Sequence, residues 1–205
     1  MISYRLKVLL LRLRHNSPLL IDLSLSFDDG YLFDDDCLRA IASASLQSID
    51  ISRNVNVTRN SVITFLTACP YLREVKLPPQ FDTDEMIRHT ADVCPHLIVL
   101  DVRGYNVSID AARYAIRKLP YLQKIKLKLR NHEDFVHLFQ DMEKYLSGLS
   151  DLAITTSYEQ RENVETYLEV FFKKFSSLKS LVIESFNGEE QYQFLVMNVS
   201  LIRCS

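Results

Sequence analysis

Residues 69–77 read Cys-Pro-Tyr-Leu-Arg-Glu-Val-Lys-Leu, and the order of residue types in them points to a defined local structure. A proline cannot continue a helix and disfavours helix at the residue before it, so Pro70 marks the place where a helix stops. After Pro70, apolar residues stand at Leu72, Val75 and Leu77, and the last three residues alternate between apolar and polar. Such alternation is typical of a half-buried strand, so the stretch predicts a helix end followed by a short strand.

The pattern Leu-x-x-Leu-x-Leu, with other aliphatic residues allowed, occurs seven times at a near-constant spacing. The copies begin at Leu20, Leu46, Leu72, Leu97, Leu122, Leu149 and Leu178, and the steps between them are 26, 26, 25, 25, 27 and 29 residues. The proline lead-in recurs with them at Pro18, Pro95 and Pro120. Self-similarity at a fixed period in this range is the signature of a repeat architecture.

Each of the earlier copies is followed by residues that start a helix. Asp34, Thr58, Asp82 and Ser108 each follow an apolar residue, and Asn131 continues the series. Their short side-chain oxygens accept hydrogen bonds from the first free backbone N–H groups of a helix, which makes them preferred N-caps. Apolar residues stand four and seven positions later, except that His89 takes the seventh position after Asp82. We expect the ring of His89 to be partly buried at a helix edge.

One unit of strand, turn and capped helix cannot bury its apolar face alone, whereas stacked units bury a continuous core. The sequence therefore predicts an α/β solenoid of about seven repeats over 17–186, with a curved parallel sheet inside and helices outside. Residues 1–16 place Leu6, Leu9, Leu10 and Leu13 on one helix face. We expect them to form a capping helix or the remnant of a preceding repeat, and 187–205 to form a C-terminal helix or tail.

Residues 69–77 resemble the cysteine-containing leucine-rich repeats of F-box proteins. The resemblance extends to Cys94-Pro95-His96-Leu97 and to residues 54–62, and it covers roughly 17–186. It implies a leucine-rich-repeat solenoid that recognises substrates in an F-box (SCF-type) ubiquitin-ligase complex, without catalytic activity of its own. An N-terminal part would then bind a Skp-type adaptor. No F-box is visible, because about sixteen residues precede Ser17.

Composition excludes several other classes. Only 4 glycines and 6 prolines occur in 205 residues, which argues against disorder, and the formal net charge of −2 gives no overall attraction to nucleic acid or membrane. No run of eighteen apolar residues and no signal peptide is visible, so we expect a cytoplasmic protein, with the nucleus as the alternative compartment. The four cysteines form no C-x-x-C pair, so we interpret them as reduced, buried thiols.

No pattern of catalytic or cofactor-binding residues stands out. There is no G-x-G-x-x-G, phosphate loop or H-E-x-x-H, so we expect no enzyme and no cofactor. The run Asp34-Asp35-Asp36, with Asp28-Asp29 before it, could suggest a cation site. We favour another interpretation, because acidic residues in a first helical turn are stabilised by the helix dipole.

The polar residues between the buried ones would form the binding face. In register, the central column reads Ser24, Asp50, Lys76, Asp101, Lys126, Ala153 and Val182, and neighbouring columns add Arg103, Lys124 and Lys128. Opposite charges on adjacent strands attract each other, and the middle of the face is cationic at Arg103, Lys124, Lys126 and Lys128. The candidate partner-binding residues are Asp50, Lys76, Asp101, Arg103, Lys124, Lys126 and Lys128, with Tyr105 and Tyr158 as loop anchors.

Three functions remain open. The first is the recognition of a protein partner, with an acidic or phosphorylated segment as the ligand of the basic strip. The second is a stand-alone scaffold in signalling or the cytoskeleton without a ligase link. The third is RNA binding through residues 124–130, which predicts a steep loss of affinity with salt. The nearby acids Asp101 and Asp151 argue against RNA.

Overall fold

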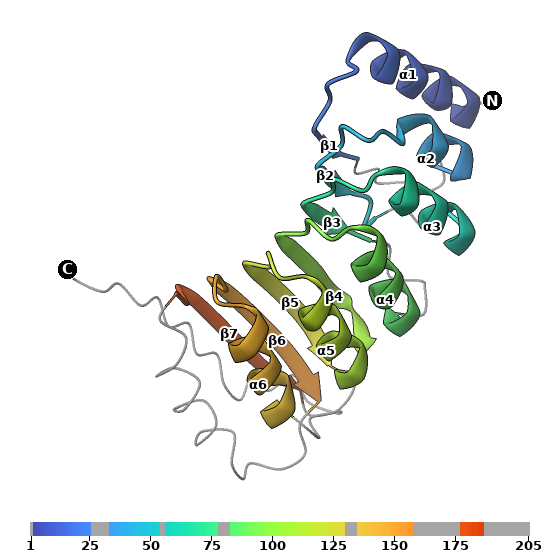
Figure 1. Cartoon of the computed structure of the whole chain (residues 1–205). Helices are drawn as coiled ribbons and strands as arrows, with labels where there is room; N and C mark the ends of the chain where they lie inside the picture. Colours follow the sequence, from blue (N-terminus) through green and yellow to red (C-terminus); the bar gives the residue numbers. More distant parts are fainter. Residues whose placement is uncertain are drawn as a thin grey trace. The chain divides into compact units, whose positions relative to one another are not determined.

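The computed structural model describes residues 2–25, 33–53, 56–77, 83–129, 135–157 and 177–186 of the 205-residue chain (Figure 1). The chain divides into two compact units, 1–97 and 98–205, which are described separately. Helices and strands alternate along the described residues up to the strand at 151–157, so the fold is α/β.

The first unit begins with a helix and then alternates strands and helices. Its elements are α1 (Ile2–Asn16), β1 (Asp22–Ser24), α2 (Asp35–Ile41), β2 (Ser48–Asp50), α3 (Arg59–Ala68), β3 (Glu74–Lys76) and α4 (Thr83–Val93). The elements of the second unit are β4 (Val99–Val107), α5 (Ile109–Lys118), β5 (Lys124–Leu129), α6 (Phe135–Tyr145), β6 (Asp151–Ser157) and β7 (Ser180–Phe186).

Within each unit the strands pair in parallel and in sequence order. In the first unit Leu23 lies opposite Ile49, and Ile49 lies opposite Val75. In the second unit the same register aligns Leu100, Ile125, Leu152 and Leu181. The middle residues of the apolar triplets therefore lie side by side within each unit, as the constant spacing requires.

The turns that lead into the strands share one pattern of backbone hydrogen bonds. The N–H of the first leucine of a triplet donates to the carbonyl three residues earlier, as in Leu72 to Cys69 at 3.3 Å and Leu122 to Leu119 at 3.3 Å. Proline at the second position of such a turn supplies the backbone angle that the turn needs. Within each unit, two backbone hydrogen bonds connect each strand start to the preceding one. For example, the N–H groups of Gln47 and Ser48 both donate to the Ile21 carbonyl, at 2.7 and 2.9 Å.

Three predicted N-caps are confirmed. The side chain of Asp34 accepts from the Cys37 N–H, that of Thr58 from Ser61 and that of Ser108 from Ala111. Each cap has an extended backbone and satisfies one N–H group that the first helical turn leaves free. The predicted caps Asp82 and Asn131 lie outside the described residues.

The core consists of the strand triplets, the inward faces of the helices and buried cysteines. Phe33 and Phe65 are among its largest fully buried side chains. Cys37, Cys69 and Cys94 are buried and not disulfide-bonded, as predicted, whereas Cys204 lies outside the described residues. Burial disfavours the thiolate and raises the pKa of Cys94 to about 12. Burial also raises the pKa of Cys69, so these two thiols are packing groups and poor nucleophiles.

Two expectations for single side chains meet different outcomes. His89 is partly buried, as predicted, and its Nε2 has no hydrogen-bond partner among the described residues. The leucines that the spacing places on one face of α1 are covered unequally: Leu10 is 3% exposed and Leu9 is 63% exposed. The buried side of α1 centres on Leu10, which faces α2 and the strands, and no described element covers the side of Leu9.

Among the described residues, no helix combines the length and apolar character that crossing a bilayer requires.

Candidate functional site

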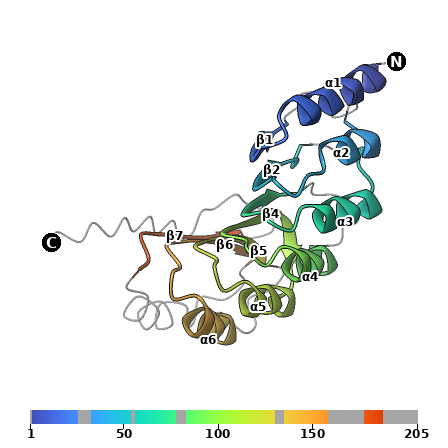
Figure 2. The same ribbon diagram turned by 45° about the horizontal axis from the view of Figure 1, so that its top comes forward.

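Strand β5 carries the centre of the candidate site. Along its sequence Lys-Ile-Lys-Leu-Lys-Leu, burial alternates strictly, so Ile125, Leu127 and Leu129 are buried and the three lysines are not. Successive side chains of a strand point to opposite faces of a sheet. The buried residues face the layer of α5 and α6, which lies on one side of the strands of this unit (Figure 2). Lys124, Lys126 and Lys128 therefore share the other face.

Two of these lysines meet acids of the neighbouring strands. Lys126 lies opposite Asp101 in the register, and its Nζ is 3.5 Å from Asp101 Oδ2. Lys124 lies opposite Asp151, and its Nζ is 3.9 Å from Asp151 Oδ2. The attraction between opposite charges on adjacent strands, which the sequence predicts, is thus realised on both sides of β5.

The remaining predicted residues of this unit divide into two groups. Lys128 is half-buried and makes no ion pair with another described side chain. Arg103 and Tyr105 belong to β4 by their backbone, but their side chains lie outside the described part of the chain, as does all of Tyr158. The structure thus brings together Lys124, Lys126 and Lys128 with two flanking acids.

Asp50 and Lys76 form a second charged group, in the first unit. Lys76 Nζ lies 3.0 Å from Asp50 Oδ2 and 3.8 Å from Glu74 Oε1. Burial raises the pKa of Asp50, but hydrogen bonds from Ser52 and Lys76 outweigh burial and lower the pKa below its ordinary value. The carboxylate is therefore charged at neutral pH, and the predicted pairing across β2 and β3 is present.

This arrangement is suited to binding through charged side chains. Fixed rows of ammonium and carboxylate groups favour partners whose charges complement them and disfavour partners of one uniform charge. No cluster of three or more His, Cys, Asp or Glu side chains that could hold a metal ion occurs in the described ranges. What the face offers chemically is ion pairing and hydrogen bonding with another molecule.

The acidic run at the start of α2 has three separate structural roles. Asp34 caps the helix, Asp35 accepts hydrogen bonds from Thr58 and Ser61 of the next helix, and Asp36 pairs with Lys7 and Arg39. Hydrogen bonds with protein donors therefore occupy all three carboxylates. This finding supports the interpretation of the run as a helix start.

The sequence analysis missed an exposed aromatic pair. The rings of Tyr71 and His96 stack at a centroid distance of 5.9 Å with an interplanar angle of 19°, and Tyr71 is 57% exposed. Both residues follow the proline of a turn, and Tyr121 occupies the same position of a turn in the second unit, where it is 60% exposed. The sequence signal that could have revealed these residues is their position between the proline and the leucine of each turn. This position precedes the alternating strand residues, and its side chain points to solvent.

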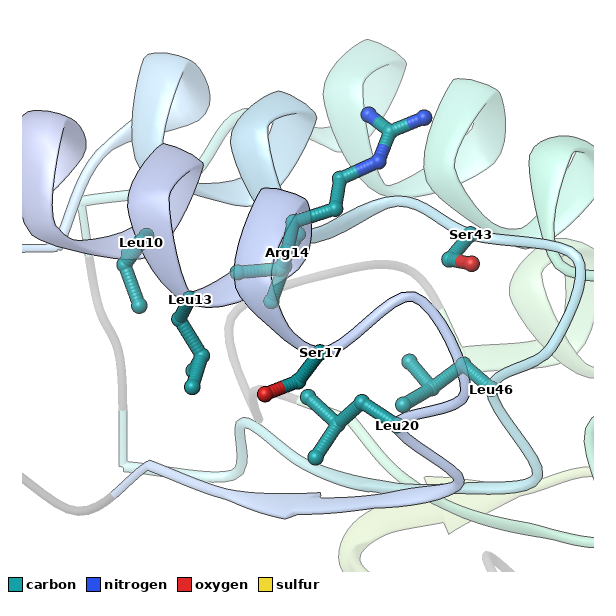
Figure 3. A pocket seen from close by; sticks show the side chains of 8 residues that line it. Leu10, Leu13, Arg14, Ser17, Leu20, Ser43 and Leu46 are labelled. Atoms are coloured by element: carbon teal, nitrogen blue, oxygen red, sulfur yellow. The ribbon is translucent and has the colours of Figure 1, made fainter.

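A small pocket lies beneath the C-terminal half of α1, where Leu10, Leu13 and Leu20 point into a common space and Arg14 points away (Figure 3). It has room for no more than about one water molecule and is mostly apolar, so it is a packing gap. It contributes no binding site for a small molecule.

Comparison with the models of known protein families and with the curated proteins finds no match for this chain.

Proposed function

We propose that this chain is a leucine-rich-repeat interaction module that binds a protein partner through the strand face around Lys124, Lys126 and Lys128. By the resemblance of residues 69–77, its role is the recognition of substrates in an F-box-type ubiquitin-ligase complex. It performs no catalysis of its own in this proposal.

The repeating backbone contacts support the repeat class. Parallel strands in sequence order, aligned triplets and turns that tie each strand to the preceding one are what a stack of leucine-rich units requires. The turn and strand at Cys69–Leu77 and those at Cys94–Val102 carry this pattern with the cysteines buried. The sequence resemblance and the geometry therefore agree on the same units.

The single observation that carries the binding proposal is the row of lysines on β5. Three ammonium groups stand on the strand face that no described helix covers, and among the described side chains acids pair with Lys124 and Lys126 but not with Lys128. An acidic or phosphorylated segment can approach Lys128 directly and compete with Asp101 and Asp151 for the other two. The same flanking acids would repel an RNA backbone.

Charge reversal tests this proposal. The variant Lys124→Glu/Lys126→Glu/Lys128→Glu is compared with Lys118→Glu/Lys144→Glu/Lys179→Glu, which makes the same change of net charge at exposed lysines elsewhere in the second unit. Both tagged proteins are recovered from cells with their partners, and thermal unfolding checks that each one is folded. We expect the strand variant to lose its substrate protein and the control to keep it.

The ligase role is read from the same purification. Recovery of a Skp-type adaptor with the full-length protein supports the ligase assignment, and the strand variant should keep the adaptor while it loses the substrate. A substrate recovered without any adaptor would identify a stand-alone scaffold. Equal recovery of the partner by both triple variants would exclude the strand face as the binding surface.

A further inference from the structure

The outer side of α1 is a helix face without a described neighbour. α1 lies beside α2 at the end of the row α1–α2–α3–α4 in both views, and no described element lies on its other side (Figures 1 and 2). On the side toward α2, Lys7 Nζ donates to Asp36 at 2.6 Å. Leu10 points into the core and is buried. No described helix or strand covers the remaining side of α1.

This open face combines one large apolar side chain with two cations. Arg5, Leu9, Arg12 and Asn16 follow one another at i, i+4, i+7 and i+11, so they share one face. All four are exposed, and the exposed fraction of Leu9 is 63%. Neither Arg5 nor Arg12 forms an ion pair with a described side chain. We call these four residues the Leu9 face.

Among the described residues, three pairs of neighbouring helices are each joined by an ion pair. Lys7 of α1 pairs with Asp36 of α2, Arg59 of α3 with Glu85 of α4, and Arg113 of α5 with Asp141 of α6. Each pair joins a cation on the earlier helix to an acid on the later one. The sequence of α1 contains no acid at all, so the Leu9 face has no acid to offer to a helix packed against it.

A second copy of the chain fits this face poorly. A two-fold contact through the Leu9 face would bring Arg5 and Arg12 of one copy against the same residues of the other, and like charges that close repel. The chemistry that complements the face is an apolar stripe flanked by carboxylates.

We propose that the Leu9 face is a second docking surface, which binds an acidic amphipathic helix of a partner protein. Apolar side chains of that helix cover Leu9, and its Asp or Glu residues pair with Arg5 and Arg12, in the manner of a helix packed on an apolar anchor. This surface does not involve the lysines of β5.

The test uses the intact chain and a designed probe. A fluorescein-labelled helical peptide of about 18 residues carries leucines at i, i+3, i+4 and i+7 with glutamates flanking them, and a matched peptide carries lysines in place of the glutamates. Binding is measured by fluorescence anisotropy. We expect the acidic peptide to bind, the basic peptide not to bind, and the affinity to fall as salt is raised.

Variants locate the contact. Leu9→Ala should weaken binding of the acidic peptide about tenfold, because Leu9 becomes buried on binding and alanine buries less apolar surface. Arg5→Glu/Arg12→Glu should abolish that binding and admit the basic peptide. Leu11→Ala, exposed on another side of α1, and Arg53→Glu/Arg73→Glu, exposed outside α1, should bind like the parent chain. The lysine triple variant of β5 should also bind normally.

Several results would overturn the proposal. They are equal binding of the two peptides, no binding of either, or binding that Leu9→Ala and Arg5→Glu/Arg12→Glu leave unchanged. A dimer in sedimentation equilibrium that Leu9→Ala dissociates would identify a second copy as the occupant instead. Binding to vesicles with anionic lipids that the same variants remove, without peptide binding, would identify a membrane surface.

Discussion

The two units use the same apolar triplet but build strands of different length from it. Strands β1, β2 and β3 have three residues each. Strands β4 to β7 have nine, six, seven and seven residues. Since the triplet is common to all seven, its presence does not set where a strand ends.

The residues after the triplet explain the difference. After Ile51, the Ser52 N–H and hydroxyl both donate to Asp50 Oδ1, at 3.1 and 2.7 Å, which forms a side-chain-closed turn and ends β2. In the second unit the strands continue past the triplet instead: β5 keeps its alternation of burial to Leu129, and β6 pairs with β7 through seven successive positions up to Ser157 and Phe186. The triplet positions a strand, and the following residues limit it.

The contacts that stabilise the interior of each unit differ accordingly. In the first, side chains connect neighbouring helices: Asp35 accepts from the Thr58 N–H at 2.6 Å and from the Ser61 hydroxyl at 2.6 Å. In the second unit, the longer strands form more backbone hydrogen bonds with one another. In addition, Asp141 of α6 pairs with arginines of α5.

Truncation of a triplet residue should affect both units alike. Ile49→Ala in β2 and Leu152→Ala in β6 remove side chains that are at most 1% exposed, so each should lower the free energy of unfolding by about 2–4 kcal/mol. Urea titration followed by circular dichroism measures this loss. Leu19→Ala, at a residue that is 82% exposed, is the control and should change stability by less than about 0.5 kcal/mol. A much smaller loss at Ile49 than at Leu152 would mean that the short-stranded unit packs loosely.

The carboxylate of Asp141 should stabilise the second unit in a pH-dependent way. It is 7% exposed and accepts from Arg113 Nε at 2.7 Å and Arg117 Nε at 3.0 Å. Asp141→Asn should cost about 2 kcal/mol, the value of hydrogen bonds to a charged group. The measurement is the urea midpoint at neutral pH.

The pH dependence follows from the direction of the pKa shift. Burial raises the pKa of Asp141, but the two arginines outweigh burial and lower it below 3.8. The group therefore stabilises the fold above pH 3.8, and this contribution disappears as the pH falls through the lowered pKa of the folded state. Asp141→Asn should lack this part of the acid transition. An unchanged acid titration in the variant would show that Asp141 does not contribute.

Removal of Asp35 should weaken the first unit. Asp35→Ala deletes an acceptor for Thr58 and Ser61, and we expect a loss of about 1–2 kcal/mol in unfolding free energy. The amide protons of α3 should also exchange faster with deuterium. Arg53→Ala, an exposed position of the same unit, serves as the control. Unaltered exchange at α3 would argue that the backbone ladder alone joins these elements.

Replacement of His89 should raise stability. His89 stands seven residues after a predicted cap, the position that Phe65 fills in α3 with a fully apolar ring. Because the buried Nε2 lacks a partner among the described residues, His89→Phe should raise the unfolding free energy by about 1 kcal/mol. The reverse change, Phe65→His, should lower it. A loss of stability in His89→Phe would show that the imidazole has a partner in the folded protein.

The charged pairs of the strand face should contribute least. Double-mutant cycles for Asp50–Lys76 and for Asp101–Lys126 should each give a coupling of about 0.2–1 kcal/mol, as is usual for partly exposed pairs. The Asp101 side chain is less exposed than that of Asp50, so its coupling should resist added salt better. Couplings well above 1 kcal/mol would mean that these residues serve stability rather than binding.

Local features of the chain were predictable from the sequence, because their causes lie within a few residues. The triplets, the turn prolines and the caps Asp34, Thr58 and Ser108 depend on steric restriction and on short-range hydrogen bonds. The constant spacing also determined which triplet residues lie side by side, because parallel strands joined by equal units must pair in register. The lysine row of β5 follows from the two-residue period of a strand.

Other features depend on which side of an element meets a neighbour, and only the tertiary structure decided them. The leucine spacing of α1 placed Leu9 with Leu10, but packing against α2 and the strands covers one and leaves the other in water. The ion pairs of Arg113 and Arg117 with Asp141 join α5 to α6. No local sequence pattern specifies how these two helices are rotated relative to each other. The stacking of Tyr71 on His96 likewise depends on the distance between adjacent turns. Local chemistry determined the turns, the helix caps and the buried residues of each strand, and packing determined which faces of the helices remain exposed.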